Sequence, residues 1–159
     1  MAAREFCVAL MVACAWAAAP GYAQSPGAKV KLTLNKVAGD RQDSDVLFTC
    51  EATLDNETGK VLYVHSSFFS TFDGVTLVVF DASGKKLKQQ GYTFHQSPSA
   101  PPGNVHSLAK GKNTKTLVFP ISELPADVKK FRVCLVGHLP GSEPDPGLLT
   151  SDLIDVNMK

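Results

Sequence analysis

The chain has 159 residues, of which 44% are hydrophobic and 19% are charged, a length that suits one ordinary globular domain. Lysine and arginine number 16 against 15 for aspartate and glutamate, so the formal net charge is +1. This balance creates no broad electrostatic field. It therefore argues against nucleic acid or an anionic membrane surface as the partner.

The first 23 residues have the three regions of a secretory signal peptide. Arg4 precedes an apolar run over Phe6–Ala19, and the small residues Gly21 and Ala23 stand where a signal peptidase cleaves. The run is too short for a membrane-spanning helix, which takes about 20 residues. We therefore expect export and cleavage after Ala23.

Cleavage at this point leaves a flexible lead of residues 24–28 and a folded domain of residues 29–159. A lipoprotein attached through Cys14 is the alternative, but it would have only a short apolar stub before the cysteine and a very apolar mature start. The expected location is secreted or periplasmic. No later stretch is apolar and long enough to span a membrane.

From Ala28 onward, apolar residues recur mostly at every second position, in short bursts separated by Gly, Asn, Asp and Pro. This is the period of half-buried β-strands, and helical spacing is almost absent. The bursts predict strands near residues 29–35, 46–55, 61–64, 75–80, 85–94, 116–120, 131–136 and 149–158. Antiparallel strands in this number usually bury their apolar faces between two sheets. The predicted fold class is all-β, an immunoglobulin-like antiparallel β-sandwich of about seven to eight strands.

Several stretches between residues 46 and 136 resemble the strand and turn pattern of secreted immunoglobulin-like domains of the BsuPI-like proteinase-inhibitor type. They are Leu54–Asn56, Val75–Asp81 with Gly84, Leu108–Gly111 followed by Leu117, and Phe131–Val133. The resemblance implies a β-sandwich and hints at protease inhibition, but it identifies no reactive loop. Unlike antibody domains, the mature chain has no Trp, and Arg132 stands where those domains place a Tyr two residues before the second cysteine.

Two of the four cysteines, Cys50 and Cys134, follow the leader, and in an exported chain they predict one disulfide. The bond would close a long loop between two strands and contribute about 4 to 5 kcal/mol in the chain-entropy model. The disulfide is the favoured interpretation, and strand alternation is the observation that speaks for the alternative. If Phe131, Val133 and Leu135 face the core, Cys134 points outward, and the two cysteines are separate buried thiols.

Two connections are candidates for contact with a partner. The first, Ser66–Gly74, contains Phe68, Phe69 and Phe72, which is more apolar surface than a connection needs. These rings either plug the end of the sandwich, the favoured interpretation, or meet a partner.

The second connection, His95–His106, contains Pro101 and Pro102 and should be extended and stiff. It either crosses from one sheet to the other, the favoured interpretation, or inserts into a protease cleft.

Four histidines lie at predicted strand ends and are candidate copper or zinc ligands: His65, His95, His106 and His138. No two of them have chelating spacing, and a lone histidine is more often a surface residue. A blue-copper site on Cys134 and His138 lacks a nearby axial Met, because the next one is Met158.

The sequence contains no motif for catalysis. No Gly-x-Ser-x-Gly elbow is present, and Asp152 and Asp155 fall on opposite faces of a predicted strand. We therefore predict no enzymatic activity and no cofactor. The expected function is that of an exported, non-catalytic binding or accessory domain that contacts a protein through loops at one end. An extracytoplasmic proteinase inhibitor and a periplasmic copper- or zinc-binding protein are the alternatives.

Overall fold

The computed structural model describes residues 29–43, 45–65, 72, 74–92, 105–139 and 146–158. The predicted signal peptide, residues 1–23, and the lead, residues 24–28, lie outside these ranges. Within them the chain forms ten β-strands, and none of it forms a helix of the length and apolarity that crossing a membrane would take.

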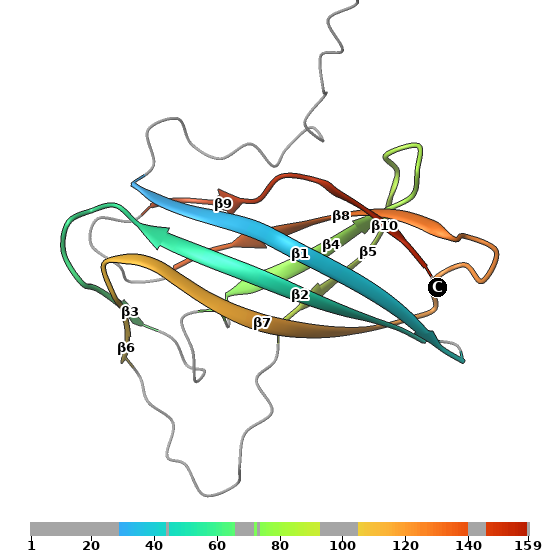
Figure 1. The fold of residues 1–159 in the computed structure, drawn as a ribbon, viewed down its shortest axis with the longest axis horizontal. Helices are drawn as coiled ribbons and strands as arrows, with labels where there is room; N and C mark the ends of the chain where they lie inside the picture. The colour runs from blue at the N-terminus through green and yellow to red at the C-terminus, as the bar shows by residue number, and fades with distance from the viewer. Residues whose placement is uncertain are drawn as a thin grey trace, which may run out of the picture.

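The protein is an all-β, immunoglobulin-like sandwich (Figure 1). The first sheet has the order β1-β2-β7, with β1 at Val30–Gln42, β2 at Asp45–Asn56 and β7 at Gly111–Ser122. The second has the order β10-β8-β4-β5, with β10 at Ile154–Asn157, β8 at Lys130–Gly137, β4 at Val75–Phe80 and β5 at Lys86–Gly91. The short β9, Leu149–Thr150, pairs with β8, and a separate two-stranded ribbon joins β3, Leu62–His65, to β6, Val105–Leu108. Every pairing is antiparallel.

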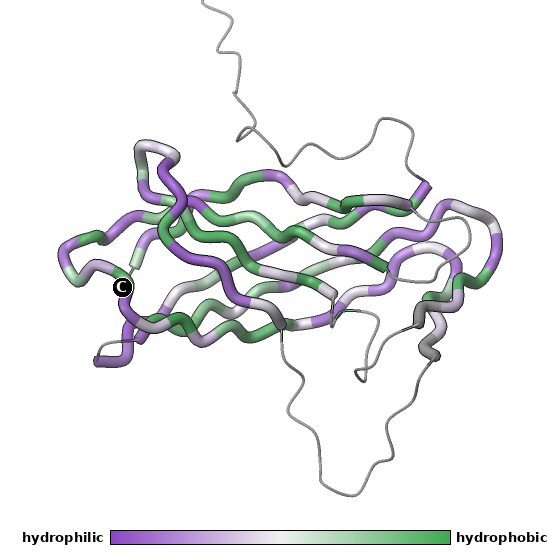
Figure 2. Tube along the Cα trace, turned by 180° about the vertical axis from the view of Figure 1, so that it is seen from behind, coloured by the Kyte–Doolittle hydropathy of each residue, from purple (hydrophilic) through white to green (hydrophobic). Residues whose placement is uncertain are grey.

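Alternation explains why these residues form two packed sheets. In β7 the inward side chains from Leu117 onward are buried and the outward ones exposed, which gives this strand one core face. Phe48 of β2 and Phe131 of β8 meet edge to face across the sandwich, with ring centroids 6.2 Å apart. Burying a side chain of this size contributes about 1.5–3 kcal/mol. In Figure 2 hydrophobic residues recur along the strands of both sheets, as this packing requires.

The disulfide predicted between Cys50 and Cys134 is not present, because both cysteines are free and buried. Cys50 belongs to the main core between the sheets. Cys134 packs instead with Val78 and Phe80 in a second cluster. The cause is strand alternation, since the neighbours of Cys134 on β8 on either side, Val133 and Leu135, belong to the main core.

The structure has more strands than the seven to eight predicted. The additional β6 falls at the end of the predicted proline-rich connection. The predicted strand over residues 149–158 is divided into β9 and β10 at Ser151, whose Oγ accepts a hydrogen bond from the backbone N–H of Leu135 at 2.9 Å.

Candidate functional site: the loop-bearing end

Three long connections begin and end at the same end of the sandwich, which we call the loop-bearing end (Figure 1). They run from β2 through β3 to β4, from β5 through β6 to β7, and from β8 to β9. The short turns that join β1 to β2, β4 to β5 and β7 to β8 lie at the opposite end. The two connections singled out from sequence, Ser66–Gly74 and His95–His106, therefore belong to one end of the molecule.

Strand pairing also places the boundaries of these two connections side by side. His65, the last residue of β3, pairs with Val105, the first residue of β6. At the other boundary, the backbone N–H of Tyr92 donates to the carbonyl of Val75 at 2.8 Å. Each connection thus leaves the strands beside the point where the other one returns. The first leaves at His65 beside Val105, where the second returns, and the second leaves at Tyr92 beside Val75, where the first returns. The intervening residues 66–71, 73 and 93–104 lie outside the described part of the chain.

The β3–β6 ribbon presents one face to the core and the other to solvent. Leu62 and Leu108 are paired across the ribbon and are both buried. Next to them, Tyr63 pairs with Ser107, and Tyr63 is 62% exposed, the highest value among the large hydrophobic residues described. Because a two-stranded ribbon is marginal on its own, the buried leucines hold it in place. The exposed Tyr63 was not among the candidates from sequence.

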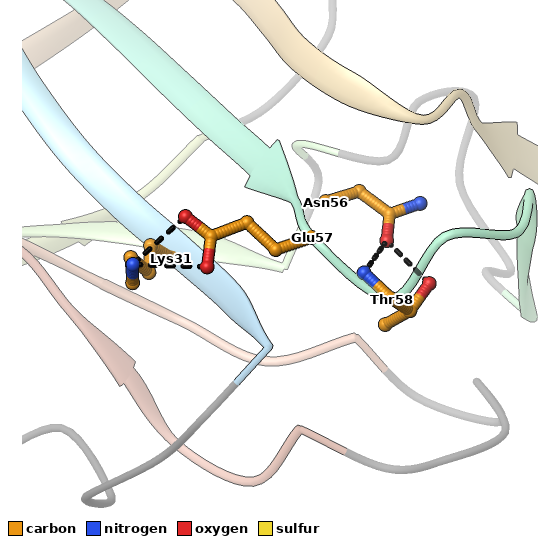
Figure 3. Close-up of polar contacts among 4 residues, drawn as sticks. All are labelled: Lys31, Asn56, Glu57 and Thr58. Carbon is orange, nitrogen blue, oxygen red and sulfur yellow. Dashed lines mark hydrogen bonds and ion pairs between the residues drawn. The ribbon is translucent and has the colours of Figure 1, made fainter.

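Asn56, the last residue of β2, ties the ribbon to the first sheet. Its Nδ2 donates to the carbonyl oxygens of Lys60 at 2.8 Å, Leu108 at 3.2 Å and Ala109 at 3.2 Å. Its Oδ1 accepts from Thr58, both from the backbone N–H at 3.1 Å and from Oγ1 at 2.6 Å (Figure 3). Asn56 is 2% exposed, so its amide spans the corner where β2 ends and β6 passes into β7.

A second polar contact closes the start of β1 beside this corner. Lys31 Nζ lies 2.8 Å from Glu57 Oε1 (Figure 3), and the Glu57 backbone N–H donates to the carbonyl of Lys29 at 2.7 Å. The hydrogen bond and charge of Glu57 raise the pKa of Lys31. Because both side chains are about half exposed, this is a surface ion pair that contributes little to stability.

Phe72 is the one phenylalanine of the predicted plug that the structure describes, and it lies in the core. Its side chain is 4% exposed and belongs to the main core. The backbone N–H of Val75 donates to the Phe72 carbonyl at 2.9 Å, and the backbone N–H of His138 donates to the Gly74 carbonyl at 3.3 Å. A Cβ on Gly74 would collide with the His138 carbonyl oxygen, so only glycine fits this close approach.

Lys115 of β7 lies at the border of the plug. Its ammonium is 5.3 Å from the Tyr92 ring centroid and 6.0 Å from that of Phe72. Tyr92 in turn packs edge to face on the core residue Phe119, with centroids 5.9 Å apart. The two aromatic faces favour a cation at this position. Lys115 thereby contacts a residue from the end of one connection, Phe72, and the residue at which the other begins, Tyr92.

The remaining predicted site residues divide into two groups. Phe68, Phe69, His95, Pro101 and Pro102 lie outside the described residues. The histidines on the ribbon are not directly opposite each other, since His65 pairs with Val105 and His106 pairs with Val64. His138 is exposed just after β8. In the part of the chain that the structure describes, no three His, Cys, Asp or Glu residues lie close enough to hold a metal ion.

The carboxylates with resolved pKa shifts lie away from the loop-bearing end and have structural causes. Asp81 accepts hydrogen bonds within the β4–β5 turn, above all from Ser83, and these lower its pKa. A hydrogen bond from Lys88 at 2.7 Å lowers the pKa of Glu123. Perturbed carboxylates that cluster in a cleft would point to catalysis, whereas these belong to a turn and a surface ion pair.

A search against protein-family models finds no family that matches this chain, and a search of curated proteins finds no match either.

Proposed function

We propose that the chain is an exported, non-catalytic binding or accessory domain that contacts a protein through the loop-bearing end. The observation that carries this proposal is the arrangement of the long connections. All three leave one end of the sandwich, and each of the two suspected from sequence begins beside the point where the other one ends. Export rests on the predicted signal peptide, and the non-catalytic role rests on the lack of a catalytic motif in the sequence.

Immunoglobulin-like domains commonly bind through such a group of loops, because a rigid sandwich positions segments whose sequence is free to suit a partner. Here β2–β4, β5–β7 and β8–β9 supply the three connections. Phe72 and Tyr92 pack into or against the core, so the frame beneath them is fixed. A fixed frame lowers the entropy that is lost on binding.

Tyr63 is the described residue best suited to anchor a partner. Tyr is among the residues that dominate binding energy at protein interfaces, because its ring buries a large area with few rotatable bonds. At 62% exposed, its side chain contributes little to the core. Val61, 39% exposed, adds apolar surface two residues earlier.

Site-specific photocrosslinking in the native host tests the proposal. A benzoylphenylalanine replaces Tyr63 in one variant and Ala82, an exposed residue of the β4–β5 turn, in the control. We expect a discrete protein adduct from position 63 and none of the same mass from position 82. The partner identified by mass spectrometry should then bind Tyr63→Ala about tenfold or more weakly than the wild-type chain, and Tyr63→Phe nearly as well. Identical adducts from both positions, or an unchanged affinity for Tyr63→Ala, would refute the proposed surface.

Inhibition of an extracytoplasmic protease is a second candidate, favoured by one observation. The proline-rich connection is clamped at both ends, by the Tyr92 backbone bond to β4 and by the pairing of β6 with β3. A segment held in this way suits the cleft of a protease, and the resemblance to BsuPI-like inhibitor domains agrees with it. The test measures steady-state inhibition of a panel of extracytoplasmic serine, cysteine and metalloproteases. Inhibition that is lost on changing Pro101 and Pro102 to Gly supports this candidate, and a panel that is uninhibited by the wild-type chain excludes it.

A further inference from the structure

The strand β7 has a long open edge. Its 12 residues pair with β2 on one side. On the other side no described strand pairs with it, because the first sheet ends at β7, which runs along its lower border in Figure 1. An open edge presents a row of backbone N–H and C=O groups to any extended chain that can pair with them.

Two observations show which backbone groups of β7 face away from β2. The side chain of Asn113 donates to the carbonyl of Leu54, so that carbonyl points toward β7 and the pair Leu54–Asn113 exchanges ladder hydrogen bonds. Pro120, which has no N–H, is tolerated because alternate positions of an edge strand direct that group to solvent. The outward backbone groups therefore belong to the alternate residues Lys112, Thr114, Thr116 and Val118.

These four residues are exposed, and in the described part of the chain their backbone groups make no hydrogen bond beyond the pairing with β2. They are every second residue of an unbroken ladder, because the pairing of β7 with β2 contains no bulge. An added strand could thus form main-chain hydrogen bonds along the whole row. Val118, 41% exposed, gives the row an apolar end.

The edge is positively charged at its other end. Lys110, Lys112 and Lys115 fall within six positions, and β7 contains no acidic residue. Among the described residues, the side chains of Lys110 and Lys112 form no ion pair or hydrogen bond. Asp55 is opposite Lys112 in the ladder but not within ion-pair distance. The charges of Lys110 and Lys112 are therefore available to a partner.

We propose that the open edge of β7 binds an extended acidic peptide segment as an added strand. The main-chain groups supply the hydrogen bonds, carboxylates of the segment meet Lys110 and Lys112, and an apolar residue covers Val118. This surface runs along the side of the sandwich, so the inference does not rest on the proposed function of the loop-bearing end.

The same charge disfavours a second copy as the occupant. Pairing β7 with β7 of another chain would add four charges, Lys110 and Lys112 of each copy, to one seam and no carboxylate from either strand, so these lysines would gain no partner. Like charges brought together across a strand pair are destabilising, and lysines on edge strands commonly prevent such self-association. An acidic segment removes this repulsion and turns it into attraction.

Hydrogen exchange followed by NMR on the purified chain tests the proposal. The probe is an end-blocked nonapeptide that has, along one face, glutamate at the alternate positions of one half and valine at those of the other half. The control peptide has lysine in place of each glutamate. We expect the acidic peptide to slow exchange of the backbone amides of Lys112, Thr114, Thr116 and Val118 by about tenfold or more at saturation, because each gains a hydrogen bond. The intervening amides already pair with β2 and should change little. The lysine peptide should have no effect.

Two variants separate backbone pairing from charge. Thr116→Pro removes one outward N–H, as Pro120 does naturally, and should abolish binding, whereas Thr116→Val should retain it. Lys112→Glu should weaken binding about fivefold to tenfold in low salt, whereas Lys129→Glu, the same charge change at the opposite end, should leave it unchanged. Lys112→Glu and Lys129→Glu change exposed side chains and leave the backbone of the edge intact, so a misfolded Thr116→Pro variant does not decide the result.

Three results would overturn the proposal: equal protection by both peptides, protection that spares the four amides, or affinity that is unchanged in Lys112→Glu. Protection of the four amides without peptide, together with a dimeric mass in solution, would assign the edge to a second copy instead and would also refute it.

Discussion

Replacing Asn56 with alanine should destabilise the protein more than any other exchange of a polar side chain for alanine in the described part of the chain. The variant removes the Nδ2 hydrogens, which serve the carbonyls of Lys60, Leu108 and Ala109, and the Oδ1 acceptor of Thr58. The two amide hydrogens and the two bonds to Oδ1 amount to about four hydrogen bonds of about 0.5–1.5 kcal/mol each. Because Asn56 is buried, water replaces them poorly, and we expect a loss of about 2–4 kcal/mol.

Urea unfolding measures this loss, with tyrosine fluorescence and circular dichroism as two independent probes. A loss of about 3 kcal/mol lowers the midpoint by about 1–2 M when the slope m is unchanged. The matched control is Asn35→Ala, which removes the bonds of an exposed asparagine to Thr53 and Glu51 and should cost less than about 1 kcal/mol. An equal loss in both variants, or a loss below about 1 kcal/mol for Asn56→Ala, would refute the reasoning.

Two further predictions concern backbone fit and thiol burial. Gly74→Ala should destabilise the protein by about 1–3 kcal/mol because its Cβ meets the His138 carbonyl. Gly91→Ala is the control and should be nearly neutral, because its Cβ meets nothing within 4 Å. Thermal unfolding of the two variants measures the difference, and equal melting temperatures would contradict the close approach. Burial raises the pKa of Cys50 to about 12 and that of Cys134 to about 11 from 9.0, so neither should react with Ellman's reagent at pH 8 until the chain is unfolded. The raised pKa values favour the neutral thiols in the folded state, so this contribution to stability is complete below pH 9 and is lost as the pH rises from 9 toward 11–12. A variant with both cysteines changed to alanine should therefore lose less stability over that pH range. An equal loss in the variant and the wild-type chain would contradict the raised pKa values.

Alternation in the sequence predicts the central strands well because it reports which face is buried. The predicted segment 46–55 lies within β2, and 131–136 lies within β8. Alternation fails where a strand is short or where a side chain replaces a backbone partner. β6 has only four residues, and Ser151 interrupts the last segment because its hydroxyl accepts the Leu135 N–H. Both features depend on tertiary contacts, which no local pattern records.

The candidate site was predictable in part. The three phenylalanines of one connection indicated a plug, and Phe72 is buried as that interpretation requires. The exposure of Tyr63 could not be foreseen, since it depends on which face of the ribbon Leu62 and Leu108 bury together. The two cysteines show the reverse case: their positions on early and late strands suggested a bond, but the alternation around Cys134 already indicated that it faces away from Cys50.

The gathering of the long connections at one end is the claim on which the rest depends, and nuclear Overhauser contacts between backbone protons test it most directly. The structure predicts a cross-strand contact between Val64 and His106, where the ribbon pairs, and a contact between the Tyr92 amide proton and Val75, where β5 leaves β4. Observing both would place the two boundaries of each connection as described. Finding the second contact without the first would separate β3 from β6 and contradict the arrangement.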